Sequence, residues 1–266
     1  MSPRWGRFRL GRGVAAILVV AVIAAVALVR HLRAPRLTPE LRGHQLAQRL
    51  GCFACHGPGG TGGIPNPGSD ENEIPAWDGG TAMMYVESEQ EIQEWILGGA
   101  PRRLAQREGG RKGEEGETDS AAALPLRMPA YRDLVSGRDL DDLVAYYKAV
   151  ADYGEMPQDA REGYRAARRL GCFGCHGPGG LVGASNPRAF KGYIPPWRGG
   201  DFHELVRNEA ELRAWIRDGS IPRLERSRAA RFFTQREIIR MPAYRSVLAA
   251  GELDALVAYV DWVSSR

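Results

Sequence analysis

The chain has 266 residues, of which 44% are hydrophobic and 26% are charged, and its formal net charge is +4. That length exceeds one typical domain, so it predicts more than one. The positive charge is confined to the N-terminus, where residues 1–36 hold seven arginines and no acid, which leaves residues 37–266 at −3. This larger part has no basic stripe and no nucleic-acid-binding motif, so DNA and RNA are excluded as partners.

The N-terminus predicts a membrane segment. Residues 13–29 form an uncharged, almost wholly aliphatic run, preceded by four arginines. Its length lies at the lower edge of a membrane-spanning helix, and Ala25-Val26-Ala27 also fits a signal-peptide cleavage site. An uncleaved anchor is the favoured interpretation, and the arginines before it place the N-terminus in the cytoplasm. Either outcome exports residues 37–266 across a bacterial cytoplasmic membrane, into the periplasm or beyond.

A ten-residue stretch occurs twice. Residues 51–60 read GCFACHGPGG and residues 171–180 read GCFGCHGPGG. Each copy contains Cys-x-x-Cys-His, the attachment signature of a c-type haem: two thiols form thioethers with haem vinyl groups, and the histidine reaches the iron. The residues expected in these roles are Cys52, Cys55 and His56, and then Cys172, Cys175 and His176.

Two other kinds of site share this cysteine spacing. A redox-active disulfide is typical of a thioredoxin-like βαβ pattern, which the sequence lacks. A four-thiolate zinc site needs its halves close together, but here they lie 120 residues apart and a histidine follows each. Covalent haem attachment is therefore favoured.

The duplication extends far beyond the motif and predicts two domains, residues 37–152 and 153–266. At an offset of 120 residues, Asn66-Pro67 matches Asn186-Pro187 and Trp77 matches Trp197. At an offset of 113, the sequence RMPAYR occurs at both 127–132 and 240–245. Between the matched parts, residues 107–120 contain no apolar side chain and predict a solvated loop.

Each copy predicts helices, and no segment alternates as a strand does. The first helix begins near Thr38-Pro39, where threonine is the N-cap, and leads into the motif. The second begins after Ser88 in the first copy and after Asn208 in the second, and glycine ends both. The third is amphipathic and closes each copy, with apolar residues at helical spacing from Leu140 onward. The expected fold class is all-α.

The order Cys-x-x-Cys-His, Met-Pro and C-terminal amphipathic helix resembles a class I cytochrome c domain, and the resemblance covers both copies. Two such domains behind an anchor resemble the diheme membrane-anchored cytochromes c of bacterial respiratory chains, which include diheme subunits of certain haem-copper oxidases. The resemblance implies two covalently bound haem c groups. It also implies methionine as the second iron ligand, here Met128 and Met241. Met83 and His203, at equivalent positions, are the competing candidates.

The resemblance implies further roles around each haem. Pro67 and Pro187 are expected to accept the imidazole N–H of the ligating histidine. Trp77 and Trp197 are expected to pack on the haem or to donate to a propionate. Arg102 and Arg223 are candidate propionate partners, Trp95 and Trp215 are expected in the core, and His44 is expected on the surface of the first helix.

The expected function is single-electron transfer by a membrane-tethered diheme cytochrome c, between a quinol-oxidising complex or dehydrogenase and a terminal acceptor. Its partners are redox proteins, and no residue is expected to be catalytic. One alternative is a haem subunit fixed in a larger oxidase or dehydrogenase, and a less favoured one is a diheme peroxidase. The net charges are −8 for residues 37–152 and +5 for residues 153–266. This difference has two interpretations: drift on solvated faces, or docking of the two copies to different partners, one basic and one acidic.

Overall fold

The computed structural model describes residues 7–69, 71–78, 80, 82–104, 126–151 and 156–265. The loop expected at 107–120 lies outside these residues. Every regular element in the described part is helical, and its only β pairings are two isolated bridges, Pro65 with Glu73 and Ser185 with Tyr193. The predicted all-α fold is confirmed.

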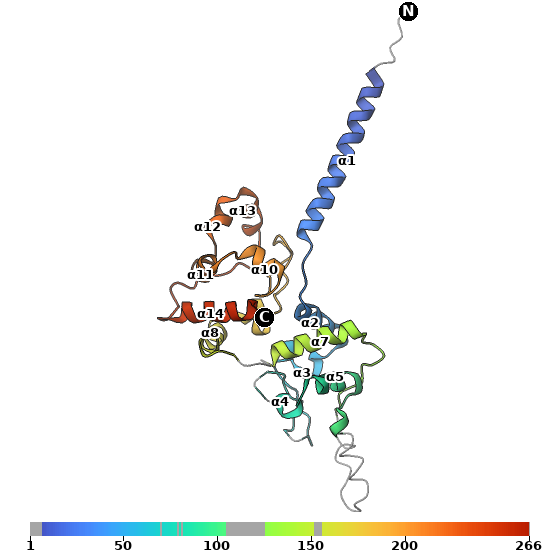
Figure 1. Ribbon diagram of the computed structural model, residues 1–266, viewed down its shortest axis with the longest axis vertical. Coiled ribbons are helices and arrows are strands. Elements are labelled where there is room, and N and C mark those ends of the chain that lie inside the picture. Colours follow the sequence, from blue (N-terminus) through green and yellow to red (C-terminus); the bar gives the residue numbers. More distant parts are fainter. Residues whose placement is uncertain are drawn as a thin grey trace, which may run out of the picture.

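A long N-terminal helix, α1 (Arg7–Arg33), projects away from the rest of the chain (Figure 1). Within it, Gly13–Arg33 is long and apolar enough to cross a membrane, and none of that stretch is buried against the protein. The helix continues past residue 29, where the uncharged run ends, because the next helix breaker is Pro35.

The helices described in the first half recur in the same order in the second half, on the other side of residues 152–155. The first half, residues 37–151, contains α2 (Pro39–Leu50), α3 (Phe53–His56), η1 (Pro58–Gly60), α4 (Ala82–Tyr85), α5 (Glu89–Gly98) and α7 (Gly137–Val150). The second half, residues 156–265, contains α8 (Gln158–Arg169), α9 (Phe173–His176), η2 (Pro178–Gly180), α10 (Gly200–Leu205), α11 (Glu209–Asp218), α12 (Pro222–Arg226), α13 (Arg228–Thr234) and α14 (Glu252–Ser264).

In each half the first and last helices cross in close contact. A side chain on Gly43 of α2 would place its Cβ 1.9 Å from the backbone oxygen of Asp142 in α7. A Cβ on Gly163 of α8 would lie at the same distance from the backbone oxygen of Ala255 in α14. Only glycine lets the two backbones approach this closely, so both crossings depend on it.

The predicted helix ends are confirmed. The side chain of Thr38 accepts from the Leu41 amide, and Ser88 and Asn208 cap α5 and α11 in the same way. These caps satisfy amides that have no partner inside the helix. Gly99 and Gly219 end the same two helices with φ of 78° and 71°, a conformation that strains other residues.

The two halves share an interface. Val182 of the second half is buried in the core cluster of the first, beside Leu41, Leu46 and Leu143. The carboxylate of Glu40, which is 5% exposed, is paired with the Arg198 guanidinium of the second half. An apolar contact and a buried ion pair therefore hold the halves together.

Candidate haem-attachment sites

The Cys-x-x-Cys-His motif occupies one short helical turn in each half. Cys52 is the N-cap of α3 and His56 is its last residue, and Cys172 and His176 have the same places in α9. All four cysteines are free and half-buried. The turn directs both thiols and the imidazole of each motif from one piece of backbone, as attachment of a haem requires.

The ring of His56 is held by a backbone carbonyl, but not by the expected one. Its Nδ1 lies 3.0 Å from the carbonyl oxygen of Pro75, whereas Pro67 was expected to accept this N–H. Residues 64 and 74 pair through their backbones, and this pairing brings Pro75 rather than Pro67 back to the motif. Since Nδ1 donates its proton to Pro75, the lone pair of Nε2 is free to bind a metal.

His176 has Pro195 as the counterpart of Pro75, so the expectation for Pro187 is corrected in the same way. Burial lowers the pKa of His176 to about 4, although donation from its ring to the Pro195 carbonyl acts in the opposite direction. Nδ1 of His176 is buried and has no hydrogen bond of good geometry within the described residues. The Pro195 contact is therefore less well aligned than that of Pro75.

Trp77 and Trp197 lie against the ligand-candidate histidines. The ring of Trp77 is 5.0 Å from that of His56, and the ring of Trp197 is 4.9 Å from that of His176. The amide of each tryptophan donates to a glycine of the motif loop, at 2.8 Å for Gly60 and 2.7 Å for Gly180. Each indole thus limits rotation of an imidazole.

The Met-Pro loop is brought to the motif in both halves. Met128 and Met241 are partly buried, and Met241 packs on the same core cluster as Cys172. Burial raises the pKa of the Cys172 thiol, and a hydrogen bond with Tyr244, three residues after Met241, opposes this. Cys52 and Tyr131 make the same pair in the first half.

A buried asparagine holds each Met-Pro loop, and the sequence alone suggests no role for it. The side chain of Asn66 donates to the Leu126 carbonyl at 3.1 Å and accepts from the Leu126 amide at 3.2 Å. Asn186, 2% exposed, makes the same kind of contact with Ile239. The repeated Asn-Pro was the available signal, but the partner lies more than fifty residues away in each case.

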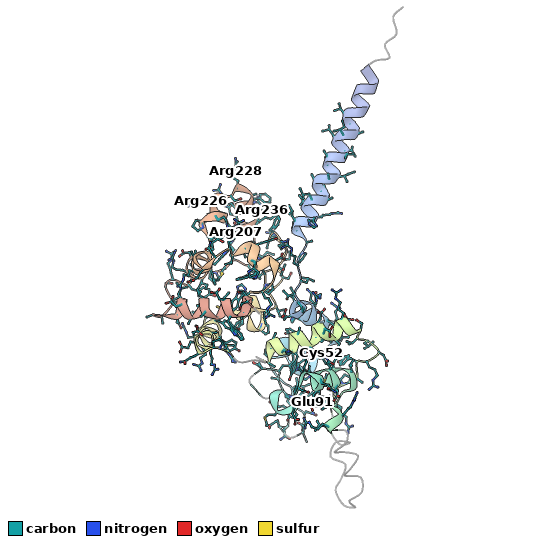
Figure 2. The ribbon with its side chains drawn as sticks, viewed as in Figure 1. Cys52, Glu91, Arg207, Arg226, Arg228 and Arg236 are labelled. Atoms are coloured by element: carbon teal, nitrogen blue, oxygen red, sulfur yellow. The ribbon has the colours of Figure 1, made fainter. Side chains whose placement is uncertain are left out.

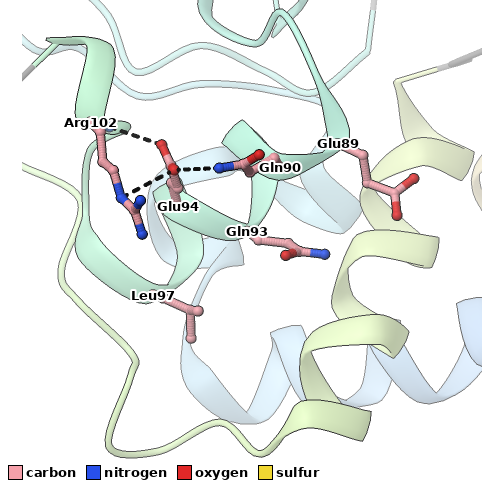
Figure 3. Close-up of a pocket in the computed structure, with 6 residues that line it drawn as sticks. All are labelled: Glu89, Gln90, Gln93, Glu94, Leu97 and Arg102. Atoms are coloured by element: carbon pink, nitrogen blue, oxygen red, sulfur yellow. Dashed lines mark hydrogen bonds and ion pairs between the residues drawn. The ribbon is translucent and has the colours of Figure 1, made fainter.

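The arginines expected near haem propionates have other partners. Arg223 makes two hydrogen bonds with Glu211, at 2.8 and 2.9 Å. Its structural counterpart is Arg103, paired with Glu91, rather than Arg102. Arg102 pairs with Glu94 in a shallow hollow of about 420 Å³ along α5 (Figure 3). These pairs close the turn after α5 and α11.

The expectation for His44 also changes. His44 is partly buried rather than fully on the surface: its ring lies 5.2 Å from Phe53 and 5.1 Å from Tyr146, and burial lowers its pKa. Tyr164 has the same place in the second half. Trp95 packs against a core cluster as expected, whereas Trp215 is partly buried and its Nε1 is buried without a partner in the described part of the chain. His203 is exposed on α10.

The donor set fits a covalently attached haem. Each half presents two free thiols, an imidazole whose Nε2 is available, and a thioether on a loop tied to the first thiol. Thioether bonds, a proximal histidine and a distal methionine are the attachments that a c-type haem uses. No group of three or more His, Cys, Asp or Glu side chains in the described residues is arranged to hold a bare metal ion.

The family model described as "Cytochrome C oxidase, cbb3-type, subunit III" matches residues 158–260. No curated protein and no solved structure matches the chain. The match covers most of the second half and includes its motif and Met241. Together with the helical fold, it shows a cytochrome c domain, which implies covalently bound haem c. The chain is thus similar to haem-based electron-transfer proteins of the c type.

Proposed function

We propose that the chain is a diheme cytochrome c that transfers single electrons on the periplasmic face of a bacterial cytoplasmic membrane. Its two domains are residues 37–152 and 153–266, and α1 is its single-pass anchor. When bound, haem c supplies a ferrous–ferric couple, and histidine–methionine ligation raises its potential. The iron ligands are His56 with Met128, and His176 with Met241. Pro67 and Pro187 stay in the haem environment as neighbours of the asparagines that hold the Met loops.

One observation supports a haem in the first half, which lies outside the residues that the family model matches. Nearly every contact around the matched motif has a counterpart in the first half. Tyr146 donates to the carbonyl of Gly59 at 2.8 Å, and Tyr259 donates to that of Gly179 at 3.1 Å. The tryptophan, asparagine and Met-loop contacts are paired in the same way. A first half that had lost its haem would have no reason to keep this set.

Each residue has a positioning task in this function. The carbonyl of Pro75 fixes the orientation of the His56 ring, and Trp77 limits its rotation. Hydrogen bonding of the second ring nitrogen makes the imidazole a more basic ligand. Asn66 and Asn186 fix the loops that carry the methionines, and would so hold these side chains in place toward a bound haem.

The contact between the halves supports electron exchange within one molecule. The two glycine-rich motif loops meet, and a Cβ on Gly59 would lie 3.2 Å from Cγ of Pro178. Gly179 in turn approaches the carbonyl of Ala149 at the end of α7. The segments that directly follow both ligand histidines therefore touch.

The test is the haem content of the full chain, produced in a host that exports it and attaches haem. We expect an intact mass higher by two haems after denaturation, and two one-electron steps in a potentiometric titration. Cys52→Ala with Cys55→Ala, or Cys172→Ala with Cys175→Ala, should each remove one haem and one step. Haem that acidified organic solvent extracts from the unmutated chain would contradict covalent attachment.

A second candidate is a haem subunit fixed in a larger oxidase or dehydrogenase. The name of the matching family supports it, because it describes a subunit of an oxidase. The chemistry of the chain is the same in both cases, and the difference lies in its partners. Gentle detergent extraction of native membranes separates them: a fixed subunit remains with other chains through size-exclusion chromatography, and a free carrier does not.

A further inference from the structure

The second half carries a surface in which arginine and phenylalanine are mixed. We call Phe190, Arg226, Arg228, Arg231, Phe232 and Arg236 the Arg/Phe surface. Residues 222–240, between α11 and Met241, contain six arginines and two glutamates. Figure 2 shows Arg226, Arg228 and Arg236 grouped around α12 and α13, at the level of the C-terminal part of α1. This segment is therefore both strongly basic and close to the candidate membrane span.

The aromatic part of this surface is exposed although it is apolar. The partly buried Phe233 lies next to both phenylalanines of this surface, with its ring 5.0 Å from that of Phe190 and 5.3 Å from that of Phe232. Phe232 is 51% exposed, and Phe190 is 38% exposed. Nearby Ile238 is 64% exposed. Contiguous apolar side chains in water mark a contact site for a membrane or a protein.

The arginines beside these rings have no acidic partner. Arg226, Arg228 and Arg231 are exposed and form no ion pair with any residue that the structure describes. The guanidinium of Arg236 lies over the Phe232 ring, 3.8 Å from its centroid, and donates to the Phe232 carbonyl. The surface thus offers several free guanidinium groups, which bind phosphate oxygens in bidentate fashion.

The surface is continuous with the end of α1. Arg33 is the last residue of the candidate span, and its Nε donates to the carbonyl of Phe190 at 2.9 Å. The Arg33 guanidinium also lies 5.8 Å from the centroid of the Phe233 ring. Lys191 reaches the carbonyl of Ala34 at 3.4 Å. If α1 spans a bilayer, the point at which it leaves that bilayer lies directly against the Arg/Phe surface.

We propose that the Arg/Phe surface lies on the same bilayer that α1 crosses, and that it binds the headgroups of anionic phospholipids in the leaflet where α1 ends. The inference rests on the proposed membrane anchor. Aromatic side chains favour the membrane–water interface, and arginines beside a membrane are attracted to anionic lipid. Bound in this way, the second half would be held at a fixed orientation to the membrane.

The test uses the full holo chain in lipid nanodiscs that contain phosphatidylglycerol and phosphatidylcholine. Phe232→p-benzoylphenylalanine places a photocrosslinker on the surface, and mass spectrometry identifies what it captures. The matched control is Leu134→p-benzoylphenylalanine, at an apolar position of the first half that is 67% exposed. We expect phospholipid adducts at position 232, more phosphatidylglycerol than its share of the lipid, and none at position 134.

A charge variant tests the role of the arginines. Arg226→Glu, Arg228→Glu and Arg231→Glu together should lower the phosphatidylglycerol adduct at position 232 at least about fivefold, the factor expected when a single basic residue near an anionic membrane is lost. An unchanged visible spectrum shows that the variant still folds and carries haem.

The experiment distinguishes failure of the membrane anchor from failure of the surface proposal. A chain that stays soluble without detergent and does not enter nanodiscs contradicts the anchor, and with it this inference. A chain that enters nanodiscs but gives equal lipid adducts at positions 232 and 134 overturns only the surface proposal. So does a protein adduct at position 232 in native membranes, because the surface would then be a docking site for a protein.

Discussion

The side-chain amide of Asn186 binds the backbone of Ile239 with both of its ends. Its nitrogen donates to the Ile239 carbonyl at 2.9 Å, and its oxygen accepts from the amides of Ile238 and Ile239 at 3.1 and 3.3 Å. Met241 lies two residues further on. A side chain 2% exposed and 53 residues away in sequence thus holds the loop that carries the proposed iron ligand.

Asn186→Ala should weaken the methionine ligand without releasing the haem. The substitution removes three hydrogen bonds to part-buried backbone groups, at a cost of about 1 kcal/mol in the free energy of unfolding. We expect the weak far-red absorption band of thioether-ligated ferric haem to fall by about half in the diheme chain, with the covalent haem content unchanged. Absorption spectroscopy and urea unfolding measure the two effects.

Asn208→Ala is the matched control. It removes an asparagine of the same half that caps α11 and makes no contact with the Met-Pro loop in the described residues. Loss of this N-cap should lower stability by about 1 kcal/mol and leave the far-red band intact. If both variants lose the band equally, general destabilisation explains the effect and the positioning role of Asn186 is wrong.

Met128→Ala and Met241→Ala should each remove about half of the far-red band and lower one of the two potentials. The reason is that methionine ligation raises the potential of a haem. Met84→Ala is the control, because Met84 is 69% exposed, lies in the first half and should change neither quantity. An unchanged spectrum in Met128→Ala or Met241→Ala would show that the assigned methionine is not a ligand, and Met83 or His203 would be examined next.

Residues 34–38 form the linker between α1 and α2. Asp201 should make the attachment of this linker to the second half sensitive to acid. It is 4% exposed and accepts from the Arg36 amide at 2.9 Å and from the Tyr193 hydroxyl at 2.7 Å. Lys191 lies 3.0 Å from its other oxygen, an ion pair without hydrogen-bond alignment. Burial raises the pKa of Asp201, but these hydrogen bonds and the Lys191 charge outweigh it, so the pKa lies below its ordinary 3.8.

A lowered pKa means that the ionised form stabilises the fold. That contribution is complete above pH 3.8, the ordinary value, and is lost as the pH falls through the lower pKa of the folded state. Trypsin cleavage after Arg36 at neutral pH should be several-fold faster in Asp201→Asn, whereas Asp218→Asn, which alters an exposed ion pair, should leave it unchanged. An acid-stable protease should show the wild-type linker opening only below pH 3.8. A wild-type linker as sensitive at pH 7 as that of Asp201→Asn would contradict this role.

Much of the fold could be predicted because its signals are local. Thr38, Ser88 and Asn208 identify helix starts through neighbouring amides, and Gly99 and Gly219 identify helix ends through their own φ. The motif likewise carries its chemistry within five residues. Such features need only a short window of sequence, so pattern and propensity suffice to find them.

The acceptor for His56 could not be predicted in the same way. Pro67 and Pro75 both follow the histidine, and the choice between them depends on backbone pairing of residues 64 and 74. The counterpart of Arg223 was also misassigned, because two adjacent arginines fit the sequence and only the contact with Glu91 selects Arg103. His44 has a polar side chain on a helix, but three-dimensional packing places it between Phe53 and Tyr146.

The two halves carry opposite net charges, −8 for residues 37–152 and +5 for residues 153–266. Residues 222–240 alone contribute six arginines and two glutamates. If the Arg/Phe surface lies on the membrane, most of the net positive charge of the second half faces lipid rather than a soluble partner. The acidic first half should then be the one that attracts a partner by charge, and that partner should be basic.

Two full-length variants isolate the halves: Cys172→Ala with Cys175→Ala keeps only the first haem site, and Cys52→Ala with Cys55→Ala keeps only the second. In nanodiscs, stopped-flow reduction of the first variant by a small basic redox protein should slow steeply as salt rises, because charge steering is screened beyond about 8 Å at physiological ionic strength. The second variant should react with a small acidic redox protein at a rate that depends weakly on salt. Transfer to detergent, which exposes the Arg/Phe surface, should strengthen the salt dependence of the second variant only. Equal and salt-independent rates for both variants would show that the charge difference has no role in choosing partners.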